Sequence, residues 1–422
     1  MDTIFALSSG RPPAAISVIR ISGPGAHSAA VRIAGSLPEA RTAAVRELRH
    51  PASGELLDEA LVLRFESPGS STGEDIVEFQ CHGGRAVVDA LLSALAGIDG
   101  LRLAEPGEFT RRAFENGRID LTEAEGLADL IEAETESQRK AALMLAEGGF
   151  RKQIAAWQEQ LLSLSALAER AIDYDDEDEA LDPSLLRGCG QLAAELRQWL
   201  DRPRIERLKD GVVVVVAGPP NAGKSSLINA ITGEDKVIVT DIPGTTRDHI
   251  EIPLSLGGVP IRLTDTAGLR SARDAVEAIG IERAERLAER ADVLVWMGGS
   301  EQAPHHPRLL KLHAKADLPG AAPQGSIPVS SVTGEGIAGL LEQVEALARS
   351  VLPGEDNIAL NRRQAKHIAE AAGALDRAAF ARDVVLIAEE LRQARGAFDR
   401  LTGRAGVEDV LDALFGRFCL GK

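Results

Sequence analysis

The segment GPPNAGKS at residues 218–225 constrains the fold of this chain more than any other feature. It follows the apolar run VVVVVA and precedes SLINAIT, so it matches the GxxxxGK(S/T) loop between a buried strand and a helix. Backbone N–H groups of such a loop surround phosphate oxygens, and the helix N-terminus adds a favourable dipole. Lys224 is expected to neutralise phosphate charge and the Ser225 hydroxyl to ligate Mg²⁺. We therefore predict a phosphate-binding loop rather than a plain strand-to-helix turn.

Two further segments stand in the order typical of a P-loop GTPase. In IRLTDTAGLR (261–270), Asp265 ends an expected strand and can hold Mg²⁺ through water, while the Gly268 N–H can approach a γ-phosphate. In TDIPGTTRD (240–248), the Thr246 hydroxyl can complete the Mg²⁺ shell. Taken singly, the first segment is more often a helix cap and the second a turn. Behind a P-loop they predict a GTP site made of Asn221, Ala222, Gly223, Lys224, Ser225, Ser226, Thr240, Asp241, Ile242, Pro243, Gly244, Thr245, Thr246, Asp265, Thr266, Ala267, Gly268, Lys315 and Asp317.

The segment expected to read the base departs from the usual NKxD pattern. It is Ala-Lys-Ala-Asp at 314–317, in which Asp317 can still accept hydrogen bonds from the guanine N1 and N2 groups, but the asparagine amide is absent. Loss of one polar base contact costs about 1–3 kcal/mol of discrimination. A later backbone loop has Ser-Ser at 330–331 in place of Ser-Ala. The preference for guanine is therefore inferred from the rest of the site.

The residue that orients the attacking water is not the usual one. Leu269 follows DTAG, at the position where Ras-like GTPases carry a water-orienting glutamine. Leucine cannot orient water, so another group is needed, and Glu277 is the nearest candidate carboxylate. The competing interpretation of Glu277 is a solvated helical glutamate.

The stretch between DTAG and residues 314–317 is short. After VLVWMGG (293–299) little room remains for a helix before RLLKLHAKAD (308–317), which predicts that one helix of the nucleotide-binding domain is missing or reduced. The segment GEGIAG (334–339) matches GxGxxG, but no second strand with a ribose-binding acid follows it. We expect a tight turn into the last helix of that domain.

Changes of pattern along the chain indicate its organisation. Residues 1–118 are typical of a mixed α/β fold, and residues 119–210 are helical with a break at Gly148-Gly149. Residues 211–351 alternate strand and helix, and residues 352–422 are again helical. Helices on both sides predict an α/β segment inserted into one helical domain, with two separate helical domains as the alternative. The acidic stretch DYDDEDEALD (173–182) is expected to be a solvated linker.

Composition excludes several classes of protein. The 422 residues carry a formal net charge of −17 and few aromatic side chains (Phe 10, Trp 3, Tyr 1), which disfavours a base-stacking RNA-binding platform. Cys81, Cys189 and Cys419 form no CxxC pair, as expected of a reduced cytoplasmic protein without a disulfide framework. No apolar run reaches the ~18 residues of a membrane span.

Taken together, the motifs resemble the MnmE family (also called TrmE) of tRNA-modification GTPases over essentially the whole chain. The resemblance rests on GPPNAGKSSLINAI, TDIPGTTRD, DTAGLR and the C-terminal CLGK, and on RISG, STGEDIVEFQCHGG and EPGEFTRRAFENGRIDL nearer the N-terminus. It implies an N-terminal α+β folate-binding-like domain (1–118) that forms a homodimer. It also implies a helical domain (119–210 and 352–422) that carries an inserted Ras-like P-loop GTPase domain (211–351).

The family resemblance also implies an activity and partners. With the FAD-dependent partner MnmG, in a heterotetramer or larger complex, such a GTPase adds a carboxymethylaminomethyl-type group to C5 of the wobble uridine (U34) of certain tRNAs. The one-carbon unit is linked to 5-formyltetrahydrofolate or a related folate. Matching motifs carry over the folate contacts to Arg20, Glu78, Arg118 and Lys422. Without the family, each of these would be interpreted as a surface or strand-end charge. Cys419 matches the family's C-terminal thiol, whose alternative interpretation is an inert thiol.

The same resemblance implies hydrolysis activated by K⁺ and facing G domains in the dimer. The side chain of Asn221, the backbone carbonyls of Thr240 and Ile242, and Thr245 would hold the ion, and Glu277 matches the water-orienting glutamate. Positive charge there would stabilise the charge that develops on the phosphates. Two alternatives stay open: an RNA- or ribosome-associated switch GTPase, which would lack the N-terminal 118 residues and the CLGK end, and a folate-binding scaffold with a degenerate G domain.

Overall fold

The computed structural model describes the chain except residues 1, 174–182, 220, 235–236, 240–250, 266–286, 288, 320–321, 355–357, 406–407, 419 and 422. It divides into two compact units, Met1–Ala128 with Asp399–Lys422, and Asp129–Phe398. Among the described residues, no helix is long and apolar enough to cross a membrane.

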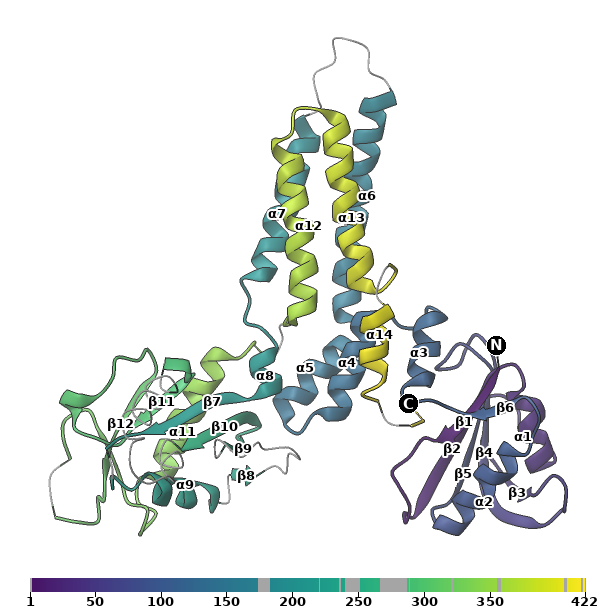
Figure 1. Cartoon of the computed structure of the whole chain (residues 1–422), viewed down its shortest axis with the longest axis horizontal. Coiled ribbons are helices and arrows are strands. Elements are labelled where there is room, and N and C mark those ends of the chain that lie inside the picture. The colour runs from purple at the N-terminus through teal and green to yellow at the C-terminus, as the bar shows by residue number, and fades with distance from the viewer. Residues whose placement is uncertain are drawn as a thin grey trace, which may run out of the picture. The chain divides into compact units, whose positions relative to one another are not determined.

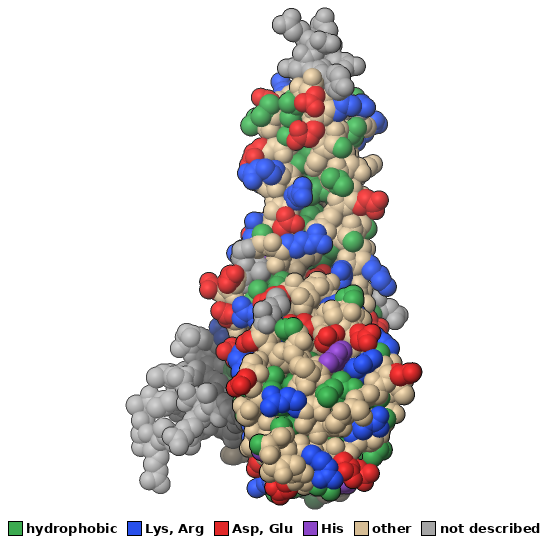
Figure 2. Space-filling view, turned by 90° about the vertical axis from the view of Figure 1, so that its right-hand side faces the viewer, with side chains coloured by type: hydrophobic (Ala, Val, Ile, Leu, Met, Phe, Trp, Pro, Cys, Tyr) green, Lys and Arg blue, Asp and Glu red, His purple; other side chains and the backbone are tan. Residues whose placement is uncertain are grey.

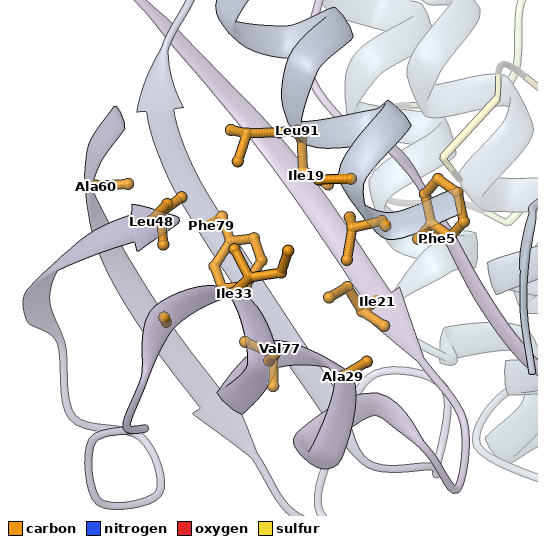
Figure 3. Close-up of a cluster of buried hydrophobic side chains, with 14 of the residues drawn as sticks. Phe5, Ile19, Ile21, Ala29, Ile33, Leu48, Ala60, Val77, Phe79 and Leu91 are labelled. Atoms are coloured by element: carbon orange, nitrogen blue, oxygen red, sulfur yellow. The ribbon is translucent and has the colours of Figure 1, made fainter. Parts of the chain in front are cut away.

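The first unit is built on a six-stranded sheet in the order β3-β4-β5-β2-β1-β6. Its strands are β1 (Thr3–Leu7), β2 (Ile16–Ser22), β3 (Ala44–Arg49), β4 (Leu56–Phe65), β5 (Ile76–His82) and β6 (Leu101–Leu103). All neighbours pair antiparallel except β1 and β6, which are parallel. Alternate strand residues such as Ile19, Ile21 and Phe79 pack on one face against α1 (Ala26–Ala34) and α2 (Arg85–Ala96), as Figure 3 shows.

The C-terminal segment of the chain belongs to this first unit. Helix α14 (Glu408–Phe415) packs with α3 (Glu108–Glu115) and with the start of α4 (Leu121–Glu132). Buried residues from both ends of the sequence form the contact: Leu121, Ala124, Ala128, Leu411, Leu414, Phe415 and Phe418. Gly107, with φ 71°, lies against the Phe415 backbone and leaves no room for a Cβ atom.

In the second unit, long helices from both sides of the α/β segment pack together (Figure 1). They are α6 (Gly149–Asp173), α7 (Pro183–Leu200), α12 (Arg362–Phe380) and most of α13 (Val384–Thr402), with α5 (Glu136–Ala146) beside α6. Four aromatic rings from three of these helices meet in the core, from Phe150, Trp157, Trp199 and Phe398. The predicted insertion into one helical domain is therefore confirmed, as is the helix break at Gly148-Gly149.

The inserted segment forms a seven-stranded sheet in the order β13-β12-β11-β7-β10-β9-β8. Its strands are β7 (Val212–Ala217), β8 (Val237–Val239), β9 (Glu251–Leu256), β10 (Val259–Asp265), β11 (Val293–Trp296), β12 (Leu309–Ala314) and β13 (Ile327–Val329). The five strands from β13 to β10 in this order are parallel, and β9 and β8 extend the sheet antiparallel. Helices α9 (Lys224–Thr232) and α11 (Ile337–Val351) contact each other and the sheet, and α8 (Glu206–Asp210) precedes β7.

In their described residues, the connections on the β11–β13 side contain no α-helix. Residues 297–308, between β11 and β12, contain only the 3₁₀ turn η2 (Ser300–Gln302), which confirms the predicted loss of a helix. The described part of residues 315–326, between β12 and β13, also contains no helix. The segment GEGIAG is a turn into α11, as predicted, with Gly336 at φ 76° as its N-cap. The predicted division into four parts at residues 118, 210 and 351 stays a prediction, and the acidic stretch at 174–182 lies outside the described residues.

We expect the aromatic cluster to stabilise the helical domain. Phe398 is fully buried in it, whereas Phe380 at the end of α12 is 87% exposed. Phe398→Ala should lower the free energy of unfolding by about 3–5 kcal/mol, because it leaves a cavity. Phe380→Ala, the matched control, should change it by less than about 0.5 kcal/mol. Urea unfolding followed by tryptophan fluorescence measures both, since Trp157 and Trp199 lie in the cluster. Equal urea midpoints for the two variants would contradict the stabilising role of the aromatic cluster.

Candidate functional site

The loop at residues 218–225 wraps from the end of β7 to the start of α9. Gly218 has φ 154°, Asn221 φ 61° and Gly223 φ 94°, so three described positions adopt conformations that ordinary side chains rarely take. Gly223 is the N-cap of α9, and Ser225 and Ser226 are exposed in its first turn. The loop therefore has the curvature and the following helix N-terminus that phosphate binding requires.

Lys224 is held inside this loop. Its side chain is buried, and its Nζ donates hydrogen bonds of 2.9 Å to the carbonyl oxygens of both Gly218 and Pro219. These carbonyls fix the ammonium group within the loop rather than in solvent. The positive charge of Lys224 thus lies where a bound phosphate would approach the α9 N-terminus.

Strand register brings the DTAG segment beside this loop. Asp265, the last residue of β10, is paired with Val216 near the end of β7. The predicted site residues Thr266, Ala267, Gly268 and Glu277 lie outside the described part of the chain, as do Thr240, Asp241, Ile242, Pro243, Gly244, Thr245 and Thr246. The structure therefore brings the backbone of Asp265 to the P-loop and leaves those eleven assignments as predictions.

The two loops expected to face the base lie next to each other. Ala314 ends β12 in register with Val329 of β13, and the Ala316 N–H donates to the Val329 carbonyl at 3.1 Å. Lys315, with φ 61°, and Asp317 are exposed just beyond the strand. Because parallel strands end at one edge of a sheet, these residues lie at the same edge as the P-loop.

Ser330 shapes the second of these loops. It is fully buried, and its hydroxyl accepts the N–H groups of Val332 and Thr333 at 3.2 Å each. The side chain is therefore committed to holding the loop in shape. Any base contact from this loop has to come from backbone groups or from the neighbouring Ser331.

In the first unit, the structure brings Arg20 and Glu78 together. They are directly opposite on β2 and β5, and the Arg20 Nε atom donates to the Glu78 Oε1 atom at 2.8 Å. Strand alternation places both on the face opposite α1 and α2. The Arg20 guanidinium also lies 5.6 Å from the centre of the Phe109 ring. Both side chains are mostly buried, with 25% and 16% of their surfaces exposed.

The C-terminal tail reaches the same sheet. The Ser8 hydroxyl donates to the Gly421 carbonyl at 2.8 Å, and Gly421, at φ 88°, leaves no room for a Cβ atom against Leu7. Leu7 is one residue beyond Ala6, the β1 residue paired with Arg20. Lys422 and Cys419 lie outside the described residues. Arg118 is exposed, with its aliphatic stem beside Gly73 in the segment before β5.

An ion network that sequence reasoning missed stabilises this part of the fold. Buried Arg112 pairs with Glu74 at 3.1 Å, with Glu108 at 3.0 Å and with Asp2 at 2.8 Å. A hydrogen bond from Arg102, reinforced by one from Arg112, holds the pKa of Asp2 below its usual value. Arg112 belongs to the motif EFTRRAFENGR, and this motif was the only feature of the sequence that pointed to the ion network.

The two described cysteines are structural. Burial raises the pKa of the Cys81 thiol to about 11, and burial likewise raises the pKa of Cys189 to about 11. Both stay protonated near neutral pH and are poor nucleophiles. Cys419 thus remains the one candidate for a reactive thiol, on sequence grounds alone.

A parallel α/β sheet with a glycine-rich loop before its first helix defines a P-loop nucleotide-binding domain, here inserted into a helical domain. The family model described as MnmE helical domain matches residues 121–419, and the one described as GTP-binding protein TrmE N-terminus matches residues 3–118. The chain belongs to the MnmE family.

Relatives that match this chain along its whole length are named as members of this family. Proteins called tRNA modification GTPase MnmE from Zymomonas mobilis subsp. mobilis and Erythrobacter litoralis are both 51% identical to this chain, over 434 and 425 residues, covering 100% of this chain and 100% of each relative. A solved G domain of the T. maritima FeoB iron transporter covers 32% of this chain and 98% of its own length at 26% identity, with a TM-score of 0.23. At that score it adds nothing to the assignment.

Proposed function

We propose that this chain is a GTPase that acts in tRNA modification. The observation that carries the proposal is the P-loop with buried Lys224 at the edge of a parallel sheet, in a chain that matches relatives named tRNA modification GTPase along their whole length. Lys224 would bind the phosphates. The hydroxyls of Ser225 and Thr246 would hold Mg²⁺, with Asp265 acting through water, and Mg²⁺ would neutralise the charge that develops on the phosphates.

The remaining site residues are assigned by their place in the motifs. Asn221, in a left-handed turn of the P-loop and exposed, would offer its side-chain oxygen to K⁺, with Thr240, Ile242 and Thr245 completing the shell. Glu277 would orient the attacking water, and Asp317 would accept from the guanine base. These assignments make hydrolysis dependent on potassium.

For the first unit we propose folate binding. Arg20 and Glu78 form a mostly buried pair beside the docked C-terminal tail. A reduced folate carries an anionic glutamate tail and an amino-pyrimidine edge, so it can offer each partner of this pair a charge-assisted hydrogen bond. Arg118 and Lys422 would add positive charge. 5-Formyltetrahydrofolate or a related folate is the ligand of this site.

A homodimer through this unit completes the proposal. The sheet face that carries Arg20 also exposes apolar side chains, with Ile16 60% and Val45 56% exposed. Burial of such a face against a second copy removes apolar surface from water.

The dimer would act in the cytoplasm with the FAD protein MnmG on the wobble uridine of certain tRNAs. On the face seen in Figure 2, basic and acidic side chains are interspersed. The formal net charge of −17 favours tRNA binding with the help of a partner.

The first test is steady-state hydrolysis of GTP and of ATP, each in potassium and in sodium buffer. We expect turnover of GTP that requires potassium. Turnover of both nucleotides would mean that the alanine at 314 has relaxed base reading while the phosphate chemistry is intact. If neither nucleotide were hydrolysed or bound, the GTPase proposal would be wrong and the folate-binding scaffold would take its place.

Glu277→Ala should slow GTP hydrolysis about ten- to a thousandfold with little change in nucleotide affinity, because only water positioning is lost. Single-turnover rates and a binding titration separate the two quantities. Glu289→Ala is the matched control, since Glu289 is an exposed glutamate further along the same segment. Unchanged turnover in Glu277→Ala would remove this residue from the mechanism.

Arg20→Ala and Glu78→Ala should each weaken 5-formyltetrahydrofolate binding about tenfold or more, since each removes a charge-assisted hydrogen bond. Isothermal titration of the full chain measures the affinity. Arg49→Ala serves as the control, because Arg49 forms an exposed pair with Glu47 on the same sheet. The folate site is refuted if both variants bind as the unmodified chain does.

A further inference from the structure

The turn that follows β11 lies directly against the P-loop. We define the Trp296 turn as residues 296–299. The Met297 N–H donates to the Ala217 carbonyl at 2.8 Å, which continues the β11–β7 pairing to the last residue before the loop. The Trp296 indole N–H donates to the Gly299 carbonyl at 3.1 Å, so the ring closes back over its own turn.

Two glycines make this contact possible. A Cβ atom at Gly298 would lie 2.8 Å from the Trp296 Cζ2 atom and 2.9 Å from the Pro219 Cδ atom. A Cβ atom at Gly218 would lie 2.9 Å from the Met297 carbonyl oxygen. Contacts this short are not tolerated, so any side chain at either position has to displace its neighbour. The Gly298 backbone therefore lies between the Trp296 indole and Pro219 of the P-loop, and no room is left there for a side chain.

The neighbouring glycine has no such role. A Cβ atom at Gly299 would meet nothing within 4 Å. Neither Gly298 nor Gly299 has a positive φ, so alanine fits the backbone conformation at both positions. What distinguishes the two is only the contact of Gly298 with Pro219 and Trp296.

Pro219 links the Trp296 turn to the phosphate site. Its carbonyl oxygen, together with that of Gly218, accepts the Lys224 ammonium at 2.9 Å. A shift of the Pro219 ring moves its carbonyl group and with it the lysine. The loop is thus held by Lys224 on one side and by the Trp296 turn on the other.

We propose that Gly298 is a positioning residue for phosphate binding: by lacking a side chain, it lets the Trp296 turn support Pro219 and so fixes the P-loop carbonyls that hold Lys224. The inference rests on the proposed nucleotide site. Because displacements of about 1 Å at a reacting centre change rates by up to about a hundredfold, a Cβ atom here has a functional and not only a structural effect.

The test measures the affinity for a non-hydrolysable GTP analogue by isothermal titration and kcat and KM for GTP in potassium buffer. Gly298→Ala should weaken binding about tenfold, while Gly299→Ala stays within about twofold of the unmodified chain. The double variant Pro219→Ala with Gly298→Ala should regain most of the affinity, because it removes the proline Cδ atom.

Lys224→Ala separates failure of this inference from failure of the proposed site. If Lys224→Ala loses at least about tenfold in affinity while Gly298→Ala binds normally, the site is right and the positioning role is wrong. If Lys224→Ala binds normally, both are wrong. If adding Pro219→Ala to Gly298→Ala does not restore nucleotide binding, the effect of Gly298→Ala does not pass through Pro219. That result would overturn the proposal. Should Gly298→Ala not fold, Trp296→Leu is added both to Gly298→Ala and to the double variant with Pro219→Ala. This removes the indole contact from both, so that the two differ only in the contact with the Pro219 Cδ atom.

Discussion

The pairing of β7 with β10 on one side and β11 on the other is the interaction on which the nucleotide domain depends. Val212, Val214, Val215 and Val216 of β7 are almost completely buried, so the strand is fixed from both faces as well as from both edges. Its register then decides what surrounds the P-loop. Asp265 is brought beside Val216, and the β11 pairing carries on to Ala217. A slip of one residue in either pairing would turn each neighbour to the opposite face of the sheet.

The insertion of this domain is stabilised where the chain enters and leaves it. The Ile205 N–H donates to the Leu360 carbonyl at 3.2 Å, and the Arg362 N–H donates to the Glu206 carboxylate at 2.6 Å. These two contacts join segments on either side of the insertion, next to the capping box that starts α12 at Asn361. Because entry and exit lie together, the α/β domain leaves the packing of α7 on α12 uninterrupted, and one helical core forms from two distant segments.

The sequence predicted whatever depends on local pattern. The P-loop, the helix break at Gly148-Gly149, the turn before α11 and the lost helix after β11 are each encoded within a few residues. The Arg112 network was not predictable, because its partners Glu74 and Asp2 are 38 and 110 residues away. Nor could the sequence distinguish Gly298 from the adjacent Gly299, since only the fold places Pro219 against one of them.

Apart from Leu269 after DTAG, the departures of this domain from the usual GTPase pattern fall on one side of its sheet. The connections after β11 and β12 lack helices in their described parts, and the altered base-reading segment at 314–317 follows β12. The side that carries β7, β10 and α9 keeps its motif, with Lys224 buried in the loop. The missing helices and the altered segment thus belong to the elements that would surround the base. The elements that would surround the phosphates keep the usual pattern. The Trp296 turn stands at the border between the two, where a short connection in place of a helix packs directly on the P-loop.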